Sequence, residues 1–289
     1  MSGGGESELG RFLRARRAAI RPESVGLAER GQRRVPGLRR DELALLCGIS
    51  IEYYVRLEQG RDQNPSKQVL DALAAALRLD EEATVHLYRL ARPVPSRRKA
   101  TESAAAPALC RLIDSWPGTP AVVTGSLSTV LASNALARML SPVHRPGTNL
   151  LRACFLDPDR QANHPDWDAE AEDKAAMLRA AVGALGEDDP ALNALVEELS
   201  AGSARFRELW RRHEIRARAR GVAVFEHPRV GELELSYERF AVLGEPGPVP
   251  GTAGQYLVMF QAEPGSASAL RLASLIEEAA SADAQAAER

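Results

Sequence analysis

One short run of the sequence, residues 50–59, carries side chains whose chemistry suits contact with the edges of DNA bases. A guanidinium such as that of Arg56 can donate two hydrogen bonds to guanine, and a carboxylate such as that of Glu52 can accept one from a cytosine amino group. The apolar surfaces of Ile51 and Tyr53 suit contact with a thymine methyl group. The four residues predict a base-reading patch, provided that one element presents them on the same side.

The same run has the pattern of a helix whose other side faces a protein core. If Tyr54 and Leu57 point inward, the 3.6-residue period directs residues 51, 52, 53 and 56 outward. Ser50 precedes the helix and suits its N-cap, and we also count Ser50 among the expected DNA contacts. Glu52 has an alternative role, because an acid in the first turn favours a helix N-terminus without any contact to DNA.

A preceding helix over residues 39–47 must pack against this run at a steep angle. Gly48 lies between the two helices and permits the positive φ that such a corner requires. The apolar side chains of both helices then form one interior, made of Leu43, Leu46, Ile49, Tyr54 and Leu57. The predicted arrangement is a helix-turn-helix.

Arginines border this predicted motif and suit contact with phosphate. Arg39 and Arg40 open the first helix, where exposed amide hydrogens and side-chain cations can bind one phosphate together. Arg61 follows the second helix. Further cations flank the same surface: Arg33, Arg34 and Lys67. The alternative for any one of these side chains is a solvated basic face.

Charge is distributed unevenly along the 289 residues. Residues 1–100 hold 19 Lys and Arg against 13 Asp and Glu, whereas residues 101–289 hold 18 against 26. This segregation suits a polyanion partner for the first part alone. Three scattered cysteines do not make a disulfide framework or a zinc site, and neither an apolar run of 18 residues nor an apolar signal sequence occurs. We therefore expect a cytoplasmic protein without membrane contact.

Periodicity and composition predict two domains of different class. Five short helices, over residues 9–20, 39–47, 50–59, 66–77 and 80–91, make an all-helical domain at residues 1–92. Residues 93–107 mix Pro, Ser and Ala with a basic triplet and are expected to be a linker.

Residues 108–289 predict an α+β domain. Its expected strands cover residues 121–124, 129–132, 221–227, 231–243 and 255–262, and its expected helices follow residue 134 and cover 168–184, 190–211 and 268–279. Strands at both ends of the domain indicate one antiparallel sheet covered by helices on one side.

The first domain resembles the helix-turn-helix of XRE (Cro/C1-type) transcription regulators. The resemblance is carried by GLRRDELALLCGISIEYYVRLEQGRDQNPSKQVLDALAAAL, with Gly48 and Gly60 in the expected register. It implies a lambda-repressor-like fold in which Glu58 is a buried acid paired with Arg17. The family usually has Gln where Arg40 stands, so the phosphate contact at this position is expected to differ.

The second domain resembles the ligand-binding domain of MmyB-like regulators, which has a PAS-like fold. The segments that carry this resemblance are NLLRACFLDP, DWDAEAEDKAAMLRA, SARFRELWRRHEI, HPRVGELELSYERF and YLVMFQAEPGS. Together the two resemblances imply a cytosolic regulator of actinobacterial type. It would bind double-stranded operator DNA as a homodimer and enclose an apolar or acyl-chain-like small-molecule effector, such as a fatty acid.

A pocket between the sheet and the long helices would be mainly apolar, with a few polar anchors. Its expected lining is Phe206, Trp210, Phe225 and Tyr237, and His213 is a candidate to orient a polar ligand head. The alternative for the aromatic residues is core packing, and for His213 a structural hydrogen bond.

The sequence contains none of the spacings typical of an enzyme or a metal site. HxH, HExxH, CxxC, GxSxG and GxGxxG are all missing, so we expect no catalysis, no metal and no cofactor. Two alternatives remain open. In one, the helix-turn-helix contacts a protein, as in an antitoxin or an anti-sigma factor, and no effector is bound; in the other, an enzyme is fused to a DNA-binding domain.

Overall fold

The computed structural model describes residues 7–27, 37–62, 64–92, 104–164, 166–186, 188–215, 219–242 and 254–287. The chain divides into two compact units. The first unit comprises Met1–Arg97, Ala175–Asp188 and Glu208–Ala217, and the second unit comprises Arg98–Lys174, Asp189–Arg207 and Arg218–Arg289. Each unit is described by itself.

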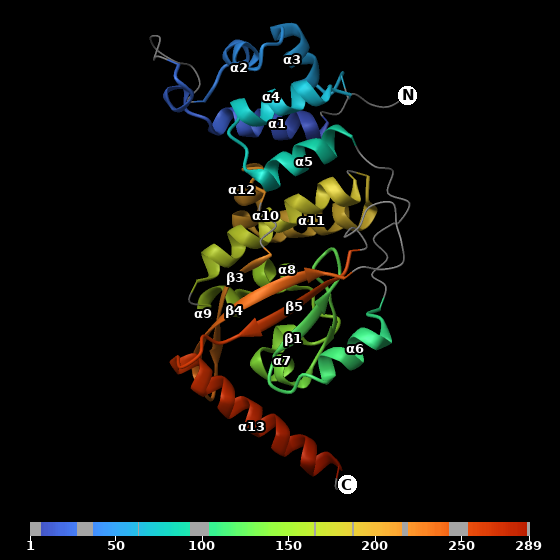
Figure 1. Ribbon diagram of the computed structural model, residues 1–289, viewed down its shortest axis with the longest axis vertical. Helices are drawn as coiled ribbons and strands as arrows, with labels where there is room; N and C mark the ends of the chain where they lie inside the picture. Colours follow the sequence, from blue (N-terminus) through green and yellow to red (C-terminus); the bar gives the residue numbers. More distant parts are fainter. Residues whose placement is uncertain are drawn as a thin grey trace. The chain divides into compact units, whose positions relative to one another are not determined.

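The first unit contains the five helices that the sequence predicts (Figure 1). They are α1 (Glu8–Ala19), α2 (Arg40–Cys47), α3 (Ile51–Glu58), α4 (Lys67–Ala76) and α5 (Glu81–Ala91). Each boundary lies within one residue of the predicted one. A short 3-10 helix, Pro22–Val25, follows α1.

Polar caps and one glycine explain where these helices begin and turn. The side chains of Ser7, Ser50, Ser66 and Asp80 each accept a hydrogen bond from a backbone N–H of the following first turn. Gly48 ends α2 with φ 65°, in the left-handed region that glycine enters without a steric penalty. The predicted corner between α2 and α3 is therefore confirmed.

The core of the first unit is made by side chains from all five helices. Its largest fully buried members include Tyr54, Phe12, Leu13, Leu43 and Leu57. Leu46 differs from the prediction, because 37% of its surface is exposed. The inward face of α2 is formed by Leu43, Ala44 and Cys47, and Leu46 lies beside this stripe rather than on it.

The second unit is built on one five-stranded sheet. Its strands are β1 (Ala121–Thr124), β2 (Val130–Ser133), β3 (Arg220–His227), β4 (Gly231–Ala241) and β5 (Tyr256–Gln261), in the order β2-β1-β5-β4-β3. Every neighbouring pair is antiparallel, and β3 pairs with β4 along its whole length. The predicted single antiparallel sheet is confirmed.

Helices pack on both faces of this sheet, which is one face more than predicted. Leu136 of α7 (Ala135–Leu140) and Leu272 of α13 (Ala267–Ala287) share a cluster with Val122 and Phe225. On the opposite face, Ile113 of α6 (Pro107–Asp114) packs with Val123 and Leu257. The sequence did not predict α6, because its apolar residues follow a Pro- and Ala-rich stretch.

The remaining helices connect the two groups of strands. They are the 3-10 helix η2 (Pro142–His144), α8 (Leu150–Leu156), α9 (Pro158–Asn163), α10 (Trp167–Leu185), α11 (Pro190–Gly202) and α12 (Ala204–Arg211). The helix predicted over residues 190–211 is interrupted at Ser203, which is extended and accepts a hydrogen bond from the backbone N–H of Phe206. Among the described residues, no helix combines the length and the apolar character needed to span a membrane.

Candidate functional site

The outer face of α3 presents polar and apolar side chains together. Ser50 caps the helix by accepting a hydrogen bond from the backbone N–H of Tyr53 at 3.1 Å. Glu52 and Arg56 are exposed, and Ile51 exposes 46% of its surface. The predicted outward orientation is therefore confirmed for these three side chains.

Tyr53 differs from the other residues of the predicted patch because part of its ring belongs to the protein core. The side chain is partly buried and packs against the core of the first unit, and this burial raises its pKa. The guanidinium carbon of Arg56 lies 5.5 Å from the centroid of the Tyr53 ring. This cation–π contact favours one direction for the Arg56 side chain.

The inner face of α3 fixes the orientation of the helix. Tyr54, Leu57 and Glu58 have no exposed surface. The carboxylate of Glu58 accepts hydrogen bonds from Arg17 Nε and Nη2 at 3.2 Å each, so the pair implied by the family resemblance is confirmed. Arg14 Nε at 3.1 Å and Arg40 Nη2 at 2.8 Å are further donors, which the sequence did not reveal.

Three arginines keep Glu58 ionised inside the protein. Burial alone would raise the pKa of this carboxyl group, but hydrogen bonds from Arg40, Arg17 and Arg14 outweigh burial and lower the pKa to about 2. The same hydrogen bond stabilises the charged form of Arg40 and raises the pKa of its guanidinium. Arg40 therefore joins the start of α2 to the end of α3, although half of its side chain stays exposed.

The other predicted phosphate contacts differ in how firmly they are held. The backbone N–H of Arg39 donates to Glu42 at 2.8 Å, while its side chain is 65% exposed and lies 3.7 Å from Asp41. Arg61 is exposed directly after α3. Lys67 forms an ion pair with Asp71 at 3.0 Å. The predicted residues Arg33 and Arg34 lie outside the described residues.

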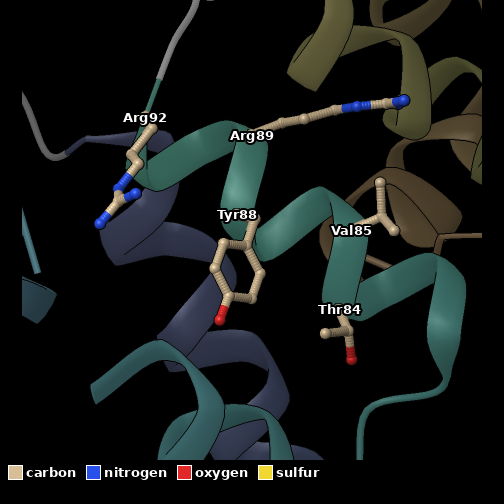
Figure 2. A pocket seen from close by; sticks show the side chains of 5 residues that line it. All are labelled: Thr84, Val85, Tyr88, Arg89 and Arg92. Carbon is tan, nitrogen blue, oxygen red and sulfur yellow. The ribbon is translucent and has the colours of Figure 1, made fainter. Parts of the chain in front are cut away.

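A shallow groove on α5 lies away from the α2–α3 surface. It is lined by Thr84, Val85, Tyr88, Arg89 and Arg92, and Figure 2 shows these side chains spread along one helix. The hydroxyl of Tyr88 donates to Asp71. None of the predicted site residues lines this groove.

The residues predicted to line a ligand pocket fall into separate places. Phe225 and Tyr237 belong to the second unit and meet around Phe260, with ring centroids 5.3 and 6.5 Å from that of Phe260. Phe206, also of the second unit, is fully buried against Phe155 at 5.0 Å. The structure thus brings Phe225 and Tyr237 together in one apolar cluster on the sheet.

Trp210 and His213 belong to the first unit instead. The guanidinium of Arg179 stacks on the Trp210 ring, with its carbon 3.3 Å from the ring centroid. His213 is 9% exposed, and its backbone is in the left-handed region with φ 49°. Trp210 and His213 therefore belong to the same unit as the helix-turn-helix, whereas Phe225 and Tyr237 lie on the sheet of the second unit.

Two family models match the chain. One describes a helix-turn-helix domain and covers residues 8–87. The other describes the MmyB-like transcription regulator ligand binding domain and covers residues 105–275, more than half of the chain. The chain belongs to the MmyB-like transcription regulators. No curated protein matches it.

Both resemblances inferred from the sequence are therefore confirmed, and the domains are those of a DNA-binding transcription regulator. The ligand-binding domain of this MmyB-like regulator also contains a residue that the sequence did not place in any site. His144 is 4% exposed and stacks on Phe260 at 5.3 Å, while its Nδ1 lies 3.0 Å from the carbonyl oxygen of Ala137.

Burial lowers the pKa of His144 to about 4, against a smaller opposing effect of the Ala137 carbonyl, so the ring is neutral at neutral pH. Because His144 belongs to no recognisable motif, the sequence of the MmyB-like regulator gave no sign that this histidine is buried in the aromatic cluster.

Proposed function

We propose that the chain is a sequence-specific, cytoplasmic transcription regulator that binds a palindromic operator as a homodimer. Its DNA-binding domain would span residues 1–92, its linker 93–107 and its ligand-binding domain 108–289. The two recognition helices of such a dimer would lie about 34 Å apart, one turn of DNA. An apolar, acyl-chain-like small molecule in the second domain would control DNA affinity.

The observation that supports DNA reading is the outward presentation of Ile51, Glu52 and Arg56 on a helix with a buried inner face. A recognition helix needs this combination, because its inner side must be fixed while its outer side enters the major groove. Arg39 and Arg61 add exposed cations at the start of α2 and after α3. Their positions suit contact with phosphates on either side of the groove.

An apolar effector is supported by the composition of the sheet cluster. Phe225, Phe260 and Leu235 lie on one face of the sheet, with Tyr237 and His144 as the polar-tipped side chains beside them. Pockets for small molecules are typically apolar with a few polar groups that orient the ligand. This cluster therefore suits an alkyl chain better than a charged metabolite.

To test sequence-specific DNA binding, the full chain is used to select duplexes from a random-sequence DNA library. The wild-type chain should select one palindromic duplex, and sedimentation should give two chains per duplex. Arg56→Ala should reduce the preference for the selected duplex over a scrambled one by about 1–3 kcal/mol, since a bidentate contact to guanine is worth this much.

The matched control is Arg111→Ala, which removes an exposed arginine from α6 of the second unit and should leave the preference unchanged. Failure of the wild-type chain to enrich any sequence would reject the proposal. An Arg56→Ala chain that keeps the full wild-type preference would reject the assignment of Arg56 to base reading.

A further inference from the structure

Two segments that the ligand-binding family model covers belong to the first unit, together with the helix-turn-helix. They are Ala175–Asp188 and Glu208–Ala217. Ile215 is 3% exposed and forms part of the core of the five helices. A methyl group on Gly183 would lie 2.8 Å from Nδ1 of His86, so α10 approaches α5 as closely as a glycine permits.

Arg179 is the charged centre of this contact. Its side chain is 3% exposed. Nη1 donates to Oε2 of Glu8 at 3.2 Å, and Nη2 donates to the carbonyl oxygen of Trp210 at 2.7 Å. Because the guanidinium also stacks on the Trp210 ring, Arg179 contacts the end of α12 and the first turn of α1 at the same time.

Burial makes this link sensitive to the loss of either partner. Burial lowers the pKa of Arg179 to about 10, and the nearby Glu8 carboxylate opposes this effect. When one partner of a buried ion pair is removed, the remaining charge is still shielded from water but no longer attracted by an opposite charge. Removal of either Glu8 or Arg179 should therefore cost more free energy than removal of one member of an exposed ion pair.

Glu8 lies in the turn of α1 that packs most closely against the end of the recognition helix. A methyl group on Gly10 would lie 2.2 Å from the carbonyl oxygen of Glu58, and one on Gly60 would lie 2.8 Å from Oγ of Ser7. Backbones this close leave no room for independent movement. A displacement of residues 7–10 must therefore displace the end of α3.

The same helix also holds the inner face of α3. Arg14 and Arg17 follow Glu8 on α1, and both donate to the buried carboxylate of Glu58. α1 thus contacts Arg179 through Glu8 and the recognition helix through Gly10, Arg14 and Arg17.

We propose that Arg179 is a positioning residue for DNA binding: through Glu8 it fixes α1, and through α1 it fixes the orientation of the recognition helix α3. This inference rests on the proposed function of α3. An effector that moves Ala175–Asp188 would change DNA affinity by weakening or strengthening the contact between Arg179 and Glu8. The ligand-binding region then controls α3 without touching DNA.

The experiment is a double-mutant cycle on the full chain with Arg179→Gln, Glu8→Gln and the double variant. Two readouts are taken: amide hydrogen exchange of residues 8–19 and 51–58 without DNA, and affinity for the duplex selected by the wild-type chain. Each single variant should speed exchange in both α1 and α3 and weaken DNA binding about fivefold or more. The effect of the double variant should be smaller than the product of the two single effects, because both changes remove the Glu8–Arg179 pair.

Two controls separate this role from general destabilisation. Arg11→Gln removes an arginine that pairs with Glu8 within α1 and leaves Arg179 in place. Arg152→Gln breaks an Arg–Glu pair with Glu198 in the second unit. Neither control should speed exchange in α3.

The outcomes distinguish this inference from the proposed function. If the wild-type chain selects no DNA, the proposed function fails. Amide exchange in α3 then shows by itself whether Arg179 is coupled to α3. Folded variants that exchange faster in α1 but not in α3, or whose effects on α3 exchange multiply in the double variant, would overturn the inference. The inference would also be overturned if the wild-type chain binds DNA and the Arg179→Gln and Glu8→Gln variants bind it with the same affinity.

Discussion

Oε1 of Glu58 accepts a hydrogen bond from Nη2 of Arg40 at 2.8 Å, which ties the first turn of α2 to the last turn of α3. The carboxylate is fully buried, whereas the Arg40 side chain is 49% exposed. Arg40 is therefore both a structural partner of Glu58 and a cation at the surface that we propose faces DNA. Arg61 is exposed just beyond the C-terminal end of α3, and the donors to Glu58 come from Arg40, Arg17 and Arg14 instead.

We predict that Arg40→Ala and Arg61→Ala both weaken binding to every DNA sequence. Each variant should reduce the slope of log affinity against log salt by about 0.9, the value for one phosphate contact. Only Arg40→Ala should also speed amide exchange in residues 51–58, because it removes the hydrogen bonds that Arg40 donates to Glu58. Fluorescence anisotropy at several salt concentrations measures the first effect. A steeper or unchanged salt slope for Arg61→Ala would contradict its assignment to phosphate.

Gly10→Ala should strongly destabilise the first unit. In an ordinary helix interior this change stabilises by about 0.5–1 kcal/mol. Here the added methyl group would lie 2.2 Å from the carbonyl oxygen of Glu58, so α1 and α3 must separate at a cost of about 3 kcal/mol. Amide exchange in α1 and α3 measures this loss. Gly118→Ala is the control, since a methyl group there meets nothing within 4 Å.

The first unit should lose stability as the pH falls below 6.5. Burial, reinforced by the charge of Arg179, lowers the pKa of His86 and of His213 to about 3 each. Because their ordinary pKa is 6.5, the unfolded chain binds their protons first, and the folded state loses on the order of 1–2 kcal/mol per histidine by pH 5. Glu58 acts in the same direction, but only below its ordinary pKa of 4.5 and down to about 2.

His213→Asn separates the histidine contribution from that of the carboxylates. Asparagine tolerates the left-handed backbone of this position, φ 49°, and does not titrate. The midpoint of thermal unfolding should therefore fall less between pH 7 and pH 5 in this variant than in the wild-type chain. His227→Asn, in the second unit, serves as the control. Equal pH dependence in His213→Asn and the wild-type chain would contradict the prediction.

Local signals explain why the helices of the first unit were predictable. A capping side chain marks the start of α1, α3, α4 and α5, and Gly48 marks the turn after α2. The orientation of α3 followed from the period of its apolar residues. Arg40 was harder to assign, because its partner Glu58 lies 18 positions away and the pairing depends on how α2 and α3 pack.

Tertiary contacts also decided the features of the second half that the sequence did not reveal. The apolar period of residues 190–211 continues across Ser203, so it could not show that α11 and α12 are separate helices. Trp210 follows Phe206 by one helical turn, yet the two belong to different units. Helical spacing shows which residues share a face, but it cannot show which core that face joins.

We expect the aromatic cluster on the sheet to bind an alkyl chain, for which dodecanoate serves as the probe. Dodecanoate should raise the midpoint of thermal unfolding of the wild-type chain, because a ligand that binds only the folded state stabilises it. Phe225 is 8% exposed and lies against His144 and Phe260, so we expect its side chain to contact the alkyl chain. Phe225→Leu should weaken dodecanoate binding about tenfold, the equivalent of roughly two buried methylene groups.

Phe240→Leu is the matched control, because this phenylalanine is 50% exposed on the neighbouring strand β4. Isothermal titration calorimetry should give the same dodecanoate affinity for Phe240→Leu and the wild-type chain. A leucine at position 225 keeps an apolar side chain in the core and so leaves the fold intact for the comparison. If dodecanoate binds Phe225→Leu as tightly as the wild-type chain, the alkyl chain lies elsewhere and Phe225 is a core residue alone.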